Sequence, residues 1–495
     1  MTVETMPHWL DKRADLTPHE IAIEDSVGPL TFEQLQRYSK MMAKKLANVG
    51  VLEGDHVAIF SNNSADYPCA LYALSYLGAV AVLINTRLSP KEIAYQLNDA
   101  EVSLLFTSSE MHDVSKRVIA KADKDIELRA IEALIIEKEK QVPLKEEINL
   151  NDLFTIVYTS GTTGSPKGVM HTYGNHWWSA VSSALNLGLN EKDKWLAALP
   201  LFHVGGLSIL MKSVIYGMPV YLLDKFDVEQ VHDAIMNKQV TSASVVAVML
   251  ERLMERLDGS HYPETFRCML LGGGPAPKPL LEKAKAARIP VYQTYGMTET
   301  SSQIVTLSPQ YALTKLGSAG KALFPAQLKI VNEGGSEQPA MCAGEILVKG
   351  PMVTGGYYQN SEANKQAFQQ DWLATGDIGY LDEEGFLYVL DRRKDLIISG
   401  GENVYPAEVE SVLLEMDGIK EVGVVGKEDD AWGQVPVAFV VKSEEAVTDD
   451  QIINHCHLHL AKFKVPKAVY FVDSLPRNAS NKLLRTKLVD RLKNF

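Results

Sequence analysis

From Leu30 to about Gly344 the sequence alternates short β-prone runs with amphipathic helical segments, which limits this part of the chain to an α/β fold. The clearest elements are a helix ending at Leu46, a strand over His56 to Phe60, a helix over Tyr67 to Leu77, and strands over Ala243 to Val246, Cys268 to Leu271 and Val291 to Thr294. Strands joined through helices pair in parallel, because the helical crossover returns the chain to the end of the sheet at which the previous strand began. We therefore expect parallel sheets covered by helices.

After about Gly344 the sequence changes to short strands joined by tight turns, followed by a compact α+β pattern. The expected strands lie over Glu345 to Val348, Gly379 to Leu381, Phe386 to Leu390, Val422 to Val425 and Val437 to Val441, with helices over Pro406 to Glu415 and up to about Lys462. A charged run, Asp391 to Asp395, separates the two patterns. We place the domain boundary at Lys394, which gives an N-terminal domain of residues 1–393 and a C-terminal domain of residues 394–495.

The composition is that of a globular protein with several compact units: 495 residues, 46% hydrophobic and 22% charged, with a net charge of −13. The acidic excess argues against a broad surface for nucleic acid or anionic lipid. The longest apolar stretch, Ala70 to Ile84, is shorter than the roughly 20 residues that span a bilayer. The first residues lack a signal core and the four cysteines are scattered, so we expect a cytoplasmic protein.

The segment Tyr158 to Val169 combines glycines, hydroxyl side chains and one lysine directly after a β-prone run. Glycines let the backbone approach a polyphosphate, hydroxyls donate hydrogen bonds, and lysine adds a positive charge. The segment is not a Walker A loop, because Pro166 precedes Lys167 and Gly168 follows it, where that loop requires Gly-Lys-Ser/Thr. It predicts a different phosphate loop, and hence nucleotide triphosphate chemistry.

Later segments carry residues that suit the same site. Gly272 to Gly274 follow a predicted strand, and open α/β sheets bind ligands at the carboxyl ends of their strands. Residues 293–300 combine an aromatic ring, glycine, hydroxyls and one carboxylate, a set that can stack a base and hold Mg²⁺. Asp377 is expected in a turn, where its carboxylate can accept hydrogen bonds from both ribose hydroxyls, and Lys482 in a polar turn near the chain end.

Together and in this order, these segments resemble the adenylate-forming family, which includes acyl-CoA synthetases, amino-acid adenylation domains and firefly-type luciferases. The resemblance covers nearly the whole chain. It implies a large N-terminal domain of packed α/β sheets with a β-barrel-like module, followed by a small, mobile α+β C-terminal domain. It also implies that the protein uses ATP, Mg²⁺, CoA and a small carboxylic acid, without nucleic acid or stable membrane insertion, and it leaves homo-oligomer formation open.

The resemblance implies a role for each matching residue. The ATP phosphates would lie against Thr159, Ser160, Gly161, Thr162, Thr163, Gly164 and Lys167. The rest of the ATP site would be formed by Gly272, Gly273, Gly274, Tyr295, Gly296, Thr298, Asp377 and Arg392. Glu299 would hold Mg²⁺, Lys394 would lie at the hinge, and Lys482 would be the catalytic lysine. The residue before that lysine is Asn481 instead of the usual glycine, and asparagine also tolerates a left-handed backbone.

Four residues would serve the acid and the thiol. His203 is typical of acyl- and aryl-CoA ligases and would have a catalytic role next to the acid, although a lone histidine can also be a packing residue. Lys212 is the only charge in the helix expected from Gly206 to Tyr216. It either extends to solvent or faces a second carboxylate or keto group of an aromatic acid. Gly400 and Gly401 would line the tunnel through which the thiol enters.

Several alternatives remain. A CoA ligase for fatty acids or for general aryl acids would not require a second carboxylate on its substrate, whereas a ligase whose Lys212 faces such a group would require it. A luciferase-type oxygenase would share the adenylation site. A protein that only binds ATP is disfavoured by the intact set of site residues. Of the histidines at 455, 457 and 459 only His455 and His459 share a helix face, so we expect no metal site there.

Overall fold

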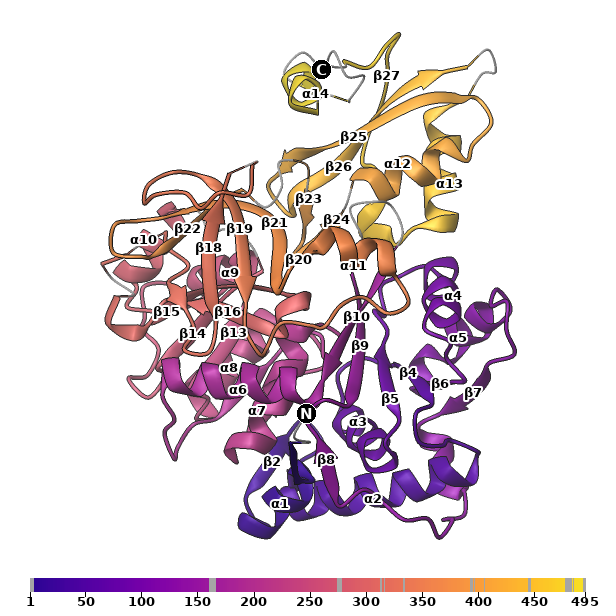
Figure 1. Cartoon of the computed structure of the whole chain (residues 1–495), viewed down its shortest axis with the longest axis vertical. Coiled ribbons are helices and arrows are strands. Elements are labelled where there is room, and N and C mark those ends of the chain that lie inside the picture. The colour runs from indigo at the N-terminus through magenta and orange to yellow at the C-terminus, as the bar shows by residue number, and fades with distance from the viewer. Residues whose placement is uncertain are drawn as a thin grey trace.

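Two mainly parallel sheets covered by helices make up the first and larger part of the fold, as the alternating pattern predicts (Figure 1). The computed structural model describes residues 4–159, 166–273, 278–311, 314–315, 317–332, 334–391, 395, 397–404, 406–443, 447–476, 483 and 485–492. Its helices are α1 (Trp9–Leu16), α2 (Phe32–Asn48), α3 (Asp66–Leu77), α4 (Pro90–Asp99), α5 (His112–Ile119), α6 (Tyr173–Leu187), α7 (Val204–Tyr216), α8 (Val228–Asn237), α9 (Ala247–Leu257), α10 (Lys278–Ala286), α11 (Ser361–Ala367), α12 (Pro406–Leu414), α13 (Asp449–His459) and α14 (Arg485–Leu492).

The six-stranded sheet carries the phosphate-loop segment. Its strands run in the order β10 (Lys167–Thr172), β9 (Leu153–Thr159), β5 (Val80–Leu83), β4 (His56–Phe60), β6 (Leu104–Thr107) and β7 (Glu127–Ala130). All neighbours pair in parallel except β9 and β10, which form an antiparallel hairpin. Because Thr159 pairs with Lys167 across this hairpin, both ends of the phosphate-loop segment are fixed by the sheet. A separate short antiparallel pair is formed by β1 (Thr5–Pro7) and β8 (Glu147–Asn149).

The nine-stranded sheet supplies the second half of the site. Its order is β17 (Lys321–Ala322), β16 (Ser302–Thr306), β15 (Val291–Met297), β14 (Cys268–Leu271), β13 (Ser242–Val245), β11 (Trp195–Ala197), β12 (Val220–Leu222), β2 (Ile21–Glu24) and β3 (Pro29–Thr31). The central strands pair in parallel and both edges are antiparallel. Strand β15 extends past the predicted end at Thr294, because β16 pairs with it around a bulge at Tyr295 and Gly296. A Cβ at Gly296 would overlap the carbonyl oxygen of Ser302, so only glycine fits this bulge.

An antiparallel module follows, formed by β18 (Gln327–Val331), β19 (Gly344–Lys349), β21 (Trp372–Leu381), β20 (Phe368–Gln369) and β22 (Leu387–Asp391). The prediction that Asp377 lies in a turn is wrong, because this residue lies within β21. The ladder pairs Glu345 with Ile378 and Leu347 with Ala374, so residues 375–377 bulge outward opposite a single residue. Gly376 takes a φ of +72° in this bulge, which explains why Thr-Gly-Asp is typical of a turn in the sequence.

The C-terminal part has its own sheet and its own core. Its strands run in the order β24 (Glu402–Val404), β23 (Ile397–Ser399), β26 (Gly433–Lys442) and β25 (Ile419–Asp429), with β27 (Val469–Phe471) also pairing with β26. The two hydrophobic clusters of this part contain, among the described residues, only side chains from Ile397 onward. Strands β25 and β26 are longer than predicted, and α13 ends at His459 rather than near Lys462. The boundary at Lys394 stays a prediction, because that residue lies outside the described ranges.

Figure 1 shows this C-terminal part above the two large sheets, with α13 close to α4. Within the described ranges, no helix combines the length and the apolar character that crossing a membrane requires.

Candidate active site

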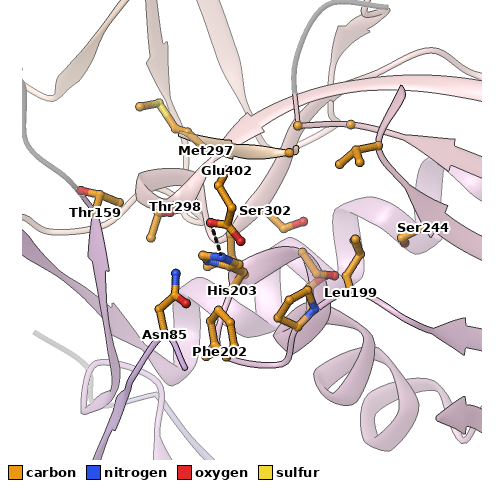
Figure 2. Close-up of a pocket in the computed structure, with 18 of the residues that line it drawn as sticks. Asn85, Thr159, Leu199, Phe202, His203, Ser244, Met297, Thr298, Ser302 and Glu402 are labelled. Atoms are coloured by element: carbon orange, nitrogen blue, oxygen red, sulfur yellow. Dashed lines mark hydrogen bonds and ion pairs between the residues drawn. The ribbon is translucent and has the colours of Figure 1, made fainter. Parts of the chain in front are cut away.

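A cavity of about 290 Å³ lies where the two large sheets meet the C-terminal sheet. Its walls include residues that follow the carboxyl ends of β5, β9 and β14, together with the end of β15 and the turn between β23 and β24. Figure 2 shows Thr159 and Thr298 on one side of this cavity and Ser244 and Leu199 on the other. Open α/β sheets bind ligands at the carboxyl ends of their strands, so the location favours a binding site.

The turn of the C-terminal sheet closes one wall of the cavity. Gly400 and Gly401 line the cavity and have positive φ angles of 58° and 82°. The next residue, Glu402, is buried and forms ion pairs with Arg87 and with His203, whose Nε2 lies 3.4 Å from Glu402 Oε2 (Figure 2). His203 therefore lies in the cavity, with its side chain 38% exposed, rather than in the core, and the packing alternative is not supported.

Glu402 is charged throughout the physiological pH range. Burial on its own raises the pKa of this carboxyl, but the interactions with His203, Arg87 and Lys464 outweigh burial and lower the pKa to about 2. The carboxylate comes from the C-terminal part, whereas Arg87 and His203 belong to the N-terminal part. The charges therefore hold the two parts together at the cavity.

A second charged group connects the two parts beside the cavity. Lys464 is almost completely buried, and its Nζ lies 2.8 Å from Glu92 Oε1 and 2.7 Å from Glu408 Oε1. Burial would lower the pKa of Lys464, but the two carboxylates raise it, so the ammonium stays charged. Glu92 belongs to α4, whereas Glu408 and Lys464 lie in the C-terminal part. Ser89, which caps α4, also donates a hydrogen bond to the carbonyl oxygen of His459, at 2.9 Å.

The phosphate side of the site is formed around the β9–β10 hairpin. Thr159 and Thr298 line the cavity, while Lys167 begins β10 behind it. Glu299 is buried next to Thr298 and accepts a hydrogen bond from the hydroxyl of Tyr357, at 3.0 Å. A carboxylate beside a phosphate site fits Mg²⁺, which usually binds one or two carboxylates together with substrate phosphates.

Tyr295 and Asp377 lie together, but outside the cavity wall. The Tyr295 hydroxyl donates a hydrogen bond to Asp377 Oδ2 at 2.7 Å, and both side chains are buried. The contact links the nine-stranded sheet to the antiparallel module. Gly272, Gly273 and Gly296, by contrast, line the cavity directly.

The walls of the cavity also contain small hydroxyl side chains among apolar residues. Ser208, Ser244 and Ser302 line the cavity, together with Phe202 and Met249. A mixture of this kind suits a substrate with an aromatic ring and polar substituents, because hydroxyls can donate hydrogen bonds to a carboxylate or keto oxygen.

Lys212 lies behind this wall, not in it. Only 1% of the residue is exposed, so the interpretation as a lysine that extends to solvent is wrong. Its Nζ lies over the Trp195 ring, 4.6 Å from the centroid, and Trp195 Nε1 donates to Ser244 of the cavity wall. The helix turns this side chain inward among apolar neighbours, so direct contact between Lys212 and the acid stays a prediction that the cavity geometry does not support.

The burial of Lys212 predicts a pH dependence of stability. Burial lowers the pKa of this ammonium from 10.5 to about 8, which corresponds to roughly 3 kcal/mol of cost to the charged folded state. Between these two pH values the unfolded state binds more protons, so the free energy of unfolding should rise with pH. Below about pH 8 the cost is fully present, and it disappears by pH 10.5. We expect the wild type to gain roughly 3 kcal/mol over this range relative to Lys212→Met, measured by urea unfolding. Parallel pH profiles of the two proteins would contradict this expectation.

Several of the predicted site residues cannot be placed. Those outside the described ranges are Ser160, Gly161, Thr162, Thr163, Gly164, Gly274, Arg392, Lys394 and Lys482. Their proposed roles stay predictions that rest on the resemblance.

Four residues of this site were not singled out from the sequence: Arg87, Tyr357, Glu402 and Lys464. Arg87 comes shortly after the parallel strand β5, and that position was an available signal. Glu402 directly follows Gly400 and Gly401, which we assigned to the tunnel, but no sequence pattern around it predicted a role for its carboxylate. Among the described residues no cluster suited to a metal ion made of histidine, cysteine and acidic side chains is found, and His455 and His459 bond to backbone carbonyls.

Comparison with known proteins finds matches over nearly the whole chain. A family model described as AMP-binding enzyme matches residues 10–358, and one described as AMP-binding enzyme C-terminal domain matches residues 408–482. A 2-succinylbenzoate–CoA ligase of Oceanobacillus iheyensis is 56% identical over 98% of this chain and 99% of its own length.

Two solved structures of o-succinylbenzoate CoA synthetase from Bacillus subtilis differ in their similarity to this fold. The double mutant bound to its product analogue has a TM-score of 0.94 at 49% identity, with 99% of both chains covered. The complex with ATP and magnesium ion has a TM-score of 0.77 at 48% identity, covering 98% of this chain and 100% of the other. Identity and coverage are nearly equal in the two comparisons, so sequence similarity does not explain the difference in TM-score.

Proposed function

Because the chain belongs to the family of AMP-binding enzymes, we propose that its cavity joins 2-succinylbenzoate to CoA at the expense of ATP. The observation that carries this proposal is the 56% identity, over nearly the full length of both chains, to a ligase of that activity. The enzyme is an AMP-forming acid–CoA ligase that uses ATP, Mg²⁺ and CoA. We propose further that its product enters menaquinone biosynthesis.

The first half-reaction joins the acid to AMP. A carboxylate oxygen attacks the α-phosphorus of ATP, the bond to the β-phosphate oxygen breaks, and pyrophosphate leaves. Both reactants are anionic, so the site must neutralise the charge that grows on the α-phosphoryl oxygens. We assign Thr159 and Lys167 to the outer phosphates, Thr298 to the α-phosphate, and Lys482 to the developing charge. Bound at Glu299, Mg²⁺ would neutralise part of the phosphate charge.

The second half-reaction transfers the acyl group to the thiol. The CoA sulfur loses its proton and attacks the acyl carbon, and the bond between that carbon and the AMP oxygen breaks. We assign the wall that includes Gly400 and Gly401 to the thiol tunnel, because glycine has no side chain to narrow it. The arrangement described here would be the one for this step, a proposal supported by the higher TM-score with the complex of the product analogue.

We expect the hydroxyl side chains of Ser208, Ser244 and Ser302 in the cavity wall to select the acid. Purified enzyme with ATP, Mg²⁺ and CoA should give a CoA thioester with o-succinylbenzoate and none with decanoate, benzoate or amino acids. Pyrophosphate release and product mass would measure this. Ester analogues that block only the distal carboxylate provide the matched control, and they should react poorly, because the hydroxyls of Ser208, Ser244 and Ser302 would lose an anionic partner. Thioester formation with decanoate or benzoate instead would support the alternative, a ligase for fatty or simple aryl acids.

A further inference from the structure

The segment Thr354 to Tyr358 runs along β10, the strand that begins with Lys167. Val169 and Tyr357 form an antiparallel bridge, Tyr358 N donates to the Gly168 carbonyl at 2.8 Å, and Met170 N donates to the Gly356 carbonyl at 3.1 Å. Asn364 also fixes the backbone of Tyr357, because its Oδ1 accepts from Tyr357 N at 2.7 Å and its Nδ2 donates to Tyr357 O at 3.1 Å. The backbone of Tyr357 is therefore held from two sides.

The side chain of Tyr357 lies between two charged residues of the phosphate side. Its hydroxyl donates to Glu299 Oε1 at 3.0 Å, and Lys167 Nζ lies 5.1 Å from the centroid of its ring. The second distance falls within the range in which an ammonium is attracted to an aromatic face. Tyr357 and Glu299 are both buried, so the hydrogen bond between them forms away from bulk water, whereas Lys167 is half-buried. One side chain thus contacts both the cation assigned to the phosphates and the carboxylate assigned to Mg²⁺.

The segment is also connected to the backbone of Glu299. Thr354 N donates to the Glu299 carbonyl at 2.8 Å, so the segment contacts both the backbone and the carboxylate of that residue. A hydrogen bond donated to one oxygen of an ionised carboxylate fixes the rotation of that group. Partners of this kind set the geometry of carboxylates that hold metal ions, and their loss typically weakens metal binding.

We propose that Tyr357 is a positioning residue. Its hydroxyl fixes the orientation of the Glu299 carboxylate for the metal ion, and its ring holds Lys167 in place beside that carboxylate on the phosphate side. The inference rests on the proposed function, since it assumes ATP and a divalent cation at this site. A purely structural role is the alternative, because the ring also packs against Val169 and Ala363. The two roles differ in what the hydroxyl contributes, because packing requires only the ring.

The test is Tyr357→Phe, which removes the hydroxyl and keeps the ring. Mn²⁺ binding to the full-length enzyme in the presence of a non-hydrolysable ATP analogue would be followed by electron paramagnetic resonance, without any acid. We expect the Mn²⁺ concentration for half-saturation to rise about tenfold, the usual result of losing a partner of a metal ligand. Thioester formation from preformed acyl adenylate and CoA should not change, because no phosphate needs to be neutralised before that step.

Tyr358→Phe is the matched control. This neighbouring tyrosine donates its hydroxyl to Glu101 at 2.8 Å, on the surface, so the variant loses the same group without touching Glu299. It should bind Mn²⁺ like the wild type, and the thermal midpoints of the two variants should agree. Unchanged Mn²⁺ binding by Tyr357→Phe, or equal loss of both half-reactions with a lower midpoint, would overturn the inference. A wild type that does not bind Mn²⁺ with the ATP analogue would overturn the proposed function, and this inference with it.

Discussion

Lys464→Met should slow thioester formation from preformed acyl adenylate by about a hundredfold or more, since removing one partner of a buried ion pair costs about 3–5 kcal/mol. The change leaves the Glu92 and Glu408 carboxylates buried and unpaired at the contact between the two parts of the chain. The arrangement assigned to the second half-reaction would lose this energy, whereas a rotated arrangement would not. Pyrophosphate release in a single turnover should therefore stay near the wild-type rate, and rapid-quench measurement of each half-reaction would show the difference.

Two further variants separate this effect from misfolding. Glu92→Gln removes only the carboxylate on α4 and keeps the pair between Lys464 and Glu408, so it should give a smaller loss of the same kind. Lys91→Met removes another contact across the same interface, the pair with Glu415 at 3.4 Å, in which the side chains are 49% and 53% exposed. Exposed pairs contribute little, so we expect an effect of no more than about threefold. Equal slowing by Lys91→Met and Lys464→Met would contradict the role of burial.

Lys482→Ala should slow the first half-reaction and spare the second, the opposite of the effect expected for Lys464→Met. Loss of a cation aimed at the charge that develops in the transition state should reduce acyl adenylate formation by about a hundredfold or more. Thioester formation from preformed adenylate should be nearly unaffected, because the lysine would have left the site when the second half-reaction begins. Pyrophosphate release and thioester formation would be measured separately with synthetic acyl adenylate.

Arg491→Ala provides a control for Lys482→Ala, because it removes another cation from the same stretch of sequence, whose Nη1 donates to the Ser474 carbonyl oxygen on the exposed surface. We expect both half-reactions to be retained in that variant. Equal loss of both half-reactions in Lys482→Ala would contradict the division of labour, as would a rate of adenylation close to that of the wild type.

The sequence predicted those features that depend on local patterns. Apolar runs located strands such as β14, and Gly272 and Gly273 after this strand line the cavity, because parallel strands end at a common edge. Asp377 was assigned to a turn because Thr-Gly-Asp usually forms one, whereas pairing with β19 makes it a bulge within a strand. That pairing involves residues about thirty positions away, which no local pattern reveals.

Contacts between distant residues could not be predicted in the same way. Glu92 and Lys464 are 372 positions apart, and each is an ordinary charge on the sequence. Tyr357 follows two glycines, a typical turn sequence, and only the bridge to Val169 places its hydroxyl near Glu299. Lys212 was recognised as unusual, but the residues facing it, Trp195 among them, come from another element. The sequence therefore indicated which residues are unusual more reliably than what they contact.

The C-terminal part has a hydrophobic core of its own, and this separation affects how such an enzyme can evolve. If that part rotates, as the resemblance implies, these core side chains would stay covered, and the balance between the two arrangements would depend in part on the charged residues at the contact. Single substitutions there could shift the enzyme toward accumulating adenylate or toward rapid thiol capture, without loss of either fold. Because Lys464 and its two carboxylate partners are buried, their contribution to this balance should be largely insensitive to the salt concentration of the cell.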